Sequence, residues 1–103
     1  MEITVTARHC EIDNLLRDRA AQLIERAAKL AWRPQRAEIV FDEDHKRQIV
    51  ELHLYMPRDN VHVASAEASD FRTALDRAME KLRNQLDKLH SSPASRRQAV
   101  GEK

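Results

Sequence analysis

The residues best suited to chemistry in this sequence are cations on one flank of its last predicted helix, which begins at Ser69 or Asp70 and ends near His90. At about 100° per residue, that flank comprises Thr73, Arg77, Lys81, Asn84, Gln85 and Lys88. It has three cations and no carboxylate. Arginine and lysine side chains neutralise phosphates and donate hydrogen bonds to them. Ordinary solvated helix surface explains the same spacing, so the pattern suggests a polyanionic partner without specifying one.

The remaining helix charges are more mixed. The opposite flank of the last helix holds residues that can pair at i, i+3 or i, i+4: Arg72, Asp76, Glu80, Arg83 and Asp87. An earlier predicted helix has a weaker basic border, where Arg19 and Arg26 lie beside the apolar stripe and Lys29 lies further round. Both helices are therefore expected to present one basic side.

Catalytic and metal-binding constellations are not recognisable. The only glycine is Gly101, so the glycine-rich loops that cradle phosphates are absent. His53 and His62 fall in neighbouring predicted strands and could approach one another, but no third metal ligand accompanies them. Cys10 lies near a helix N-terminus, which lowers thiol pKa values, yet it has no recognisable triad partner. We therefore predict a protein that is not an enzyme, with no cofactor, no metal and no small-molecule substrate.

Length and composition indicate one small domain. The chain has 103 residues, of which 42% are hydrophobic and 34% charged, and the apolar residues are patterned as in globular proteins. The single cysteine excludes an internal disulfide and fits a reducing compartment. No stretch approaches the ~18 apolar residues of a membrane span, and no signal peptide precedes the first strand-like alternation. We expect a cytoplasmic protein that does not contact membranes.

Hydrophobic periodicity predicts an α+β fold with the order β-α-β-β-β-α. The predicted strands cover about residues 2–7, 37–44, 48–56 and 61–68. Asp13 caps a helix that should end near Trp32, before Pro34. We expect a four-stranded sheet with two helices on one face, in which strands two to four form an antiparallel meander. Residues 1–90 form the domain, and residues 91–103 are predicted to be a disordered tail.

The two faces of the predicted sheet differ in character. The core face holds Ala37, Ile39, Phe41, Val50, Leu52, Leu54, Met56, Ala64 and Ala66. The open face presents Glu2, Glu38, Asp42, Glu51 and Glu67, with Thr4, Thr6, His53, Tyr55 and Ser65. A phosphate backbone should avoid this acidic face and meet the helices instead. The net charge of +1 therefore conceals a dipolar molecule.

A family likeness lies in the segment Ala64–Leu89, ASAEASDFRTALDRAMEKLRNQLDKL. It resembles the last strand and helix of the ribosome hibernation-promoting factor and ribosome-associated inhibitor family. The matching motifs are the Ala-x-Ala-Glu strand end, Asp70-Phe71, Ala-Leu-Asp at 74–76 and Lys-Leu-x-x-Gln-Leu at 81–86. The opening is similar too, from Ile3 to His9 and in Leu16-Arg17-Asp18. The likeness spans about residues 1–90 in the order of elements predicted above.

The resemblance implies a short-form protein that binds the small ribosomal subunit and its rRNA. Members of the family occupy the decoding channel, where mRNA and the A- and P-site tRNAs would lie, and silence translation in stationary or stressed cells. The implied contacts are made by the helices to phosphates. The chain stops before the second domain by which long-form members pair ribosomes, so we do not expect that mechanism.

The resemblance also implies the residues of the site. The family's basic positions fall on Arg8, Arg17, Arg26, Lys29, Lys81 and Lys88. Arg77 extends the same stripe and joins the RNA-binding candidates, although the family pattern does not carry it. Two departures from the family are Leu23, where a lysine is common, and Trp32-Arg33-Pro34, where an aromatic-Asp-Arg ending is usual.

Two alternatives remain open at this stage. The sheet with two helices is similar to double-stranded RNA-binding domains, so a generic duplex RNA binder is one alternative. The other is a protein–protein interaction module, in which Val40, Ile49 and Tyr55 on the open sheet face form a small apolar patch that supports a weak homodimer.

Overall fold

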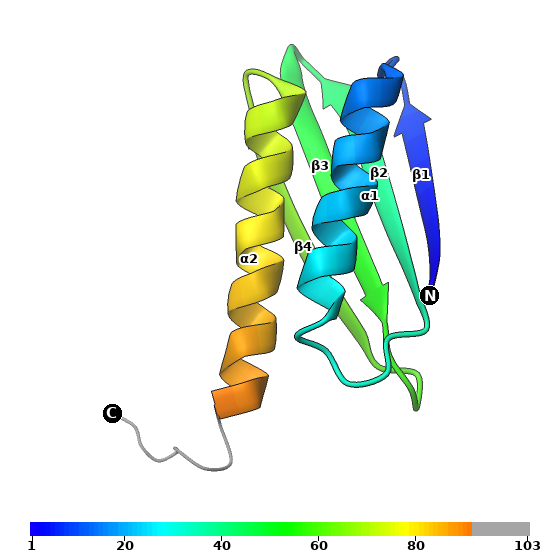
Figure 1. Cartoon of the computed structure of the whole chain (residues 1–103). Coiled ribbons are helices and arrows are strands. Elements are labelled where there is room, and N and C mark those ends of the chain that lie inside the picture. The colour runs from blue at the N-terminus through cyan, green and yellow to red at the C-terminus, as the bar shows by residue number, and fades with distance from the viewer. Residues whose placement is uncertain (92–103) are drawn as a thin grey trace.

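The structure consists of a four-stranded sheet with two helices packed on one of its faces (Figure 1). The computed structural model describes residues 1–91. Its elements are β1 (Glu2–Arg8), α1 (Asn14–Ala28), β2 (Arg36–Asp44), β3 (Arg47–Tyr55), β4 (Val61–Ala68) and α2 (Phe71–Ser91). The predicted α+β class and element order are confirmed. The predicted tail, residues 91–103, lies outside the described residues except for Ser91, the last residue of α2.

The sheet has the strand order β1-β2-β3-β4, so β1 and β4 form its two edges. β1 pairs with β2 in parallel, and α1 makes the crossover between them. β2, β3 and β4 form the predicted antiparallel meander. In Figure 1 both helices lie in front of the sheet and run in the same direction, with α2 beside the β4 edge. Neither described helix is long and apolar enough to cross a membrane.

The core fills the space between the helices and one sheet face. Its strand residues are those that the alternation predicted, together with Ala68, and the central ones, Ile39, Phe41, Leu52 and Leu54, are fully buried. The predicted Met56 follows the end of β3 and is only partly buried. Phe41 contacts Phe71 edge to face, with 5.4 Å between ring centroids, which joins β2 to the first turn of α2. The helices therefore have fixed positions above the sheet, and so do the charged side chains that they carry.

An aspartate caps each helix. The predicted cap of α1 is confirmed, since Asp13 Oδ1 accepts a hydrogen bond of 2.8 Å from the backbone N–H of Leu16. At α2, Asp70 accepts from the backbone N–H of Thr73 at 2.7 Å and from its hydroxyl at 3.0 Å. These bonds from Thr73 lower the pKa of the Asp70 carboxyl, because they stabilise its charged form.

The prediction that the first helix ends near Trp32 is wrong, because α1 ends at Ala28. Beyond it, the backbone N–H groups of Lys29, Leu30 and Ala31 bond to carbonyls three residues earlier, which tightens the chain. Arg33 then takes a left-handed conformation with φ 53°, directly before the proline. Leu30 and Ala31 still pack against the core, so the apolar spacing continues past the end of the helix.

Candidate nucleic-acid interface

The predicted basic flank of α2 lies along the free edge of β4. Arg77 donates to the carbonyl oxygen of Glu67 at 3.2 Å, and Lys81 Nζ donates to that of Ser65 at 2.9 Å. Gln85 Nε2 continues the series by donating to the carbonyl oxygen of Val63 at 2.9 Å. We call Arg77, Lys81 and Gln85 the β4-edge ladder.

The ladder is regular because the repeats of helix and strand match. Four helical residues advance about 6 Å, and two strand residues advance about 6.7 Å. α2 and β4 run in opposite directions, so each step of i+4 on the helix meets a step of i−2 on the strand. At the other edge of the sheet, Arg17 of α1 donates to the carbonyl oxygen of Val5 in β1 at 3.0 Å. The helices thus place donors on carbonyls at both edges.

The hydrogen bonds of the β4-edge ladder leave the positive charge and most of the N–H donors of Arg77 and Lys81 available for a partner. A carbonyl oxygen is neutral, so Arg77 and Lys81 keep their full charge. An arginine has five N–H donors and a lysine three, and one donor of each is used here. Both side chains are exposed. The flank therefore combines a structural contact with an accessible positive charge.

The remaining helical candidates occupy other parts of the same side of the molecule. Arg26 and Lys29 lie at the end of α1 and line a shallow cavity with Met1, Gln22, Glu25, Ala28 and Pro34. Lys88 is exposed near the end of α2. Six of the seven predicted site residues are therefore carried by the helices or by the C-cap of α1, although they do not form one continuous patch.

Arg8 is the exception, because it lies on the open face of the sheet. Its guanidinium is 3.5 Å from Asp42 and 4.0 Å from Glu51. Asp42 also contacts His9 Nδ1 at 3.0 Å. The hydrogen bond with His9 is the main cause that lowers the pKa of Asp42, and the charge of Arg8 contributes to the same shift. Arg8 therefore lies among carboxylates, away from the helical cations.

The open face is less acidic than predicted. By strand register it presents three arginines, Arg8, Arg36 and Arg47, that the prediction omitted. Arg47 pairs with Glu67 at 3.2 Å, and Arg36 stacks over the ring of Tyr55 at 3.8 Å. Carboxylates still outnumber the arginines there, with Asp44 added to the predicted five: Glu2, Glu38, Asp42, Glu51 and Glu67. The open face keeps an excess of negative charge.

The predicted apolar patch on the open face has other members than expected, because Val61 and Val63, paired with Tyr55 and His53, are 44% and 46% exposed there. Val40 is only 8% exposed, because it lies in an inner strand between Thr6 and Glu51. Ile49 and Tyr55 are partly exposed.

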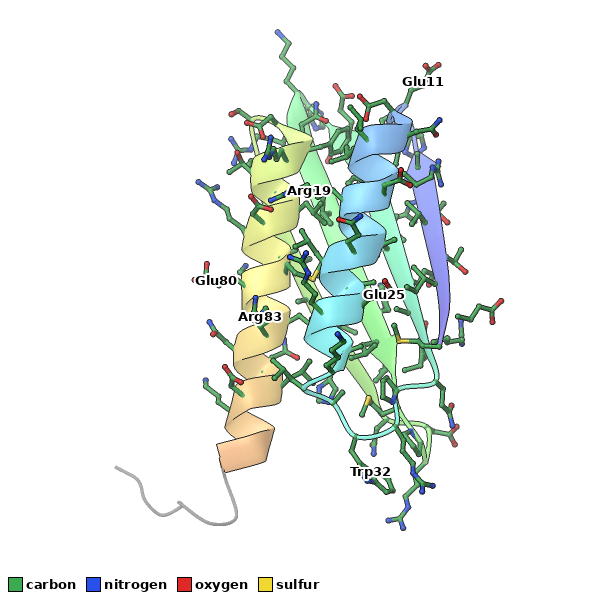
Figure 2. The ribbon with its side chains drawn as sticks, viewed as in Figure 1. Glu11, Arg19, Glu25, Trp32, Glu80 and Arg83 are labelled. Atoms are coloured by element: carbon green, nitrogen blue, oxygen red, sulfur yellow. The ribbon has the colours of Figure 1, made fainter. Side chains whose placement is uncertain are left out.

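The acidic flank of α2 faces the groove between the two helices. Arg19 of α1 donates to Asp76 of α2 at 3.0 Å, and Figure 2 shows the Arg19 side chain reaching toward α2. A shallow groove beside this pair is lined by Leu23, Asp76, Met79, Glu80, Arg83, Asn84 and Asp87. The sequence predicted that Asp76 pairs within its own helix, but its partner comes from α1. Of the positive side chains of α2, Arg77 and Lys81 thus lie at the β4 edge, whereas Arg83 lines this groove together with three carboxylates.

The alternative reactive sites are not assembled. His53 and His62 lie on opposite faces of the sheet, since His53 is paired with Val63 and His62 with Leu54. Among residues 1–91, no group of three His, Cys, Asp or Glu side chains is placed to hold a metal ion. Burial raises the pKa of the Cys10 thiol, and Asp42 and Glu43 add to that effect. This thiol resists ionisation, as a structural cysteine does.

Arg17 and Gln85 donate to edge carbonyls that the sequence pattern did not reveal. The i, i+4 spacing of Arg77, Lys81 and Gln85 is visible in the sequence, but it does not reveal that an edge strand lies beside them. Arg17 was singled out only by family resemblance, and its bond to Val5 gives it a structural role in addition.

Comparison with known proteins relates the sequence and the fold of this chain to one family. Residues 3–92 match the family model described as Sigma 54 modulation protein / S30EA ribosomal protein. The chain is 28% identical over 88 residues to the ribosome hibernation promoting factor of Pseudomonas putida, which covers 85% of each chain.

Two solved structures share the fold. A ribosomal subunit interface protein from Coxiella burnetii superposes with a TM-score of 0.79 at 25% identity, covering 88% of this chain and 99% of the other. The N-terminal domain of Thermus thermophilus Protein Y gives a TM-score of 0.74 at 23% identity, covering 86% and 99%.

Proposed function

Because the chain belongs to the Sigma 54 modulation protein / S30EA ribosomal protein family, we propose that it is a ribosome hibernation factor. It binds the small ribosomal subunit through its helical side and occupies the decoding channel, so that mRNA and tRNA cannot enter. Translation stops while the protein is bound. No catalytic step is required, because binding alone blocks the channel.

The observation that carries this proposal is the unequal distribution of charge between the two sides of the molecule. Within Asn14–Lys29 and Phe71–Lys88 the cations are Arg17, Arg19, Arg26, Lys29, Arg72, Arg77, Lys81, Arg83 and Lys88. The carboxylates in the same segments are Asp18, Glu25, Asp76, Glu80 and Asp87. The open sheet face has the opposite excess. A polyanion such as rRNA is attracted to the helical side and repelled by the sheet, so the bound orientation follows from electrostatics.

Within the helical side, the β4-edge ladder is the strongest candidate for phosphate contact. Arg77 and Lys81 are held by carbonyls at a fixed spacing of one helical turn, so little side-chain freedom remains to be lost when a phosphate binds. Arg26, Lys29 and Lys88 extend the contact along the helices. Arg17 supports β1 and adds positive charge near the start of α1.

The experiment is co-sedimentation of the protein with isolated ribosomal subunits across a range of salt. Release of counterions from phosphates makes binding fall by orders of magnitude between ~50 and ~200 mM salt when about six contacts are made. We expect binding to the small subunit, loss of binding at high salt, and inhibition of translation in vitro. Small subunits preloaded with mRNA and tRNA should bind less protein. Failure to bind either subunit at low salt would refute the proposal.

A further inference from the structure

An exposed tryptophan lies at the end of the molecule where the sheet meets the α1–β2 loop. Trp32, the only tryptophan of the chain, is 65% exposed. Figure 2 shows it at the end opposite Glu11. It forms one wall of a cavity of about 600 Å³, whose other residues come from the β3–β4 turn and the start of β4. A tryptophan exposed to this extent leaves its ring available to stack on a flat ring of a partner.

The cavity combines an apolar floor with hydrogen-bond donors. Its lining residues are Trp32, Met56, Pro57, Arg58, Asn60, Val61 and His62, and none of them is a carboxylate. The guanidinium of Arg33 lies 5.1 Å from the centre of the Trp32 ring, which brings a second arginine to the site. An indole face, an amide and two arginines match a flat heteroaromatic ring attached to a phosphate.

The backbone around this cavity is already fixed. The β3–β4 turn is closed by a bond of 2.8 Å from the N–H of Met56 to the carbonyl of Asn60. The α1–β2 loop is tied to the sheet by a bond of 2.8 Å from the N–H of Gln35 to the carbonyl of Tyr55. Three residues here, Arg33, Arg58 and Asp59, have left-handed conformations with φ between 53° and 66°. Such conformations are unfavourable for residues other than glycine, and they cluster where a binding site needs a particular loop shape.

We propose that this cavity binds an unpaired base of an RNA strand, which stacks on Trp32 while Arg33 and Arg58 neutralise the adjoining phosphates. The proposal rests on the proposed function, because it assigns a base-stacking contact to the same RNA partner. Unpaired bases are recognised by stacking on aromatic rings, with polar groups at the base edge. Asn60 and His62 supply those groups here. The absence of lining carboxylates and the presence of two arginines favour a nucleotide over a protein segment.

The test uses Trp32 itself as the probe. A single-stranded octaadenylate is titrated into the full-length protein while the tryptophan emission is recorded. Excitation is at the red edge of the indole absorption, where adenine and tyrosine do not absorb. Because the chain has no other tryptophan, a change in emission then reports the environment of this ring. We expect saturable quenching by the single strand and weaker quenching by the same octamer in an A·U duplex, whose bases are already stacked.

Two variants separate stacking from general charge attraction. Binding of a fluorescein-labelled octaadenylate, followed by anisotropy, should weaken about 5- to 100-fold in Trp32→Ala and much less in Trp32→Phe, which retains an aromatic face. Leu15→Ala is the matched control. It removes an 80% exposed apolar side chain from the first turn of α1, at the other end of the molecule, and should bind like the parent.

Unchanged tryptophan emission, equal quenching by duplex and single strand, or equal binding by Trp32→Ala would overturn the base-stacking site. A blue shift of emission that depends on protein concentration and needs no RNA would do the same, since it would assign the cavity to a second copy of the chain. Co-sedimentation with ribosomes runs in parallel. If the protein binds ribosomes but not octaadenylate, only the base-stacking site is refuted. If the protein binds octaadenylate but does not co-sediment with ribosomes, the proposal of a hibernation factor is refuted.

Discussion

Lys81 Nζ lies 2.9 Å from the carbonyl oxygen of Ser65, at the free edge of β4. An unpaired strand edge is a template for another strand, and proteins protect such edges with charge or cover. The β4-edge ladder does both, because it occupies the carbonyls and places positive charge beside them. The basic flank therefore protects the free edge of the sheet whether or not RNA is bound.

Removal of the ladder should make the protein self-associate. In the triple variant Arg77→Ala/Lys81→Ala/Gln85→Ala, the β4 carbonyls are open to a strand of another molecule. We expect a higher average mass than the parent at the same concentration in sedimentation equilibrium. The double variant Arg77→Gln/Lys81→Gln is the control, because glutamine can donate to the same carbonyls as Gln85 does. Equal masses for the parent and the triple variant would contradict the protective role.

Lys46→Gly should stabilise the protein. His45 and Lys46 have φ of 49° and 67°, the two positive values of a type I′ hairpin turn, where glycine is favoured at the second position. Relief of the left-handed strain should raise the free energy of unfolding by about 0.5–1 kcal/mol in urea titrations. Lys29→Gly is the control. Its φ is −66°, so glycine relieves no strain there and should destabilise. A loss of stability in Lys46→Gly would contradict this account of the turn.

The cap of α2 should make stability depend on acid pH. Bonds from Thr73 lower the pKa of Asp70 in the folded protein below its ordinary value of 3.8. The charged cap therefore stabilises the fold above about pH 4, and this contribution is lost as pH falls through the lower folded pKa. Asp70→Asn keeps a capping oxygen but does not titrate. The Tm advantage of the parent over this variant should shrink between pH 5 and 2; a constant difference would contradict the assignment.

The ion pair between the helices should contribute little to stability. The Arg19 and Asp76 side chains are 37% and 49% exposed, so water screens their attraction. Arg19 Nε is also buried without a hydrogen-bond partner among the described residues, which offsets part of the gain. A double-mutant cycle with Arg19→Met and Asp76→Asn should give a coupling of about 0.2–1 kcal/mol. A coupling well above that range would show that the pair stabilises helix packing.

Local patterns were sufficient to predict the elements and the core. The alternation through Ile39 and Phe41 identified both the strand and its buried face, and Asp13 identified the start of α1. The end of α1 was not predictable from apolar spacing, because Leu30 and Ala31 pack against the core from a tightened turn.

The charge on the open face was predicted only in part. Arg36 and Arg47 are the first residues of their strands and fell just outside the predicted boundaries, so their contribution to this face was missed. The pairing of Arg19 with Asp76, like the contacts of the ladder, depends on which elements become neighbours in space. The periodicity of one element carries no information about that.

The central claim is that cations at the β4 edge bind rRNA phosphates, and it is tested most directly by neutralising them without disturbing the edge. Arg77→Gln/Lys81→Gln keeps the donors and removes two charges. Arg36→Gln/Lys46→Gln removes the same charges outside the helices. In co-sedimentation with small ribosomal subunits, we expect the first variant to bind several-fold more weakly and to lose about two units from the slope of log K against log salt. The second should retain most of the binding and the slope of the parent. Equal binding by the two variants would contradict the claim.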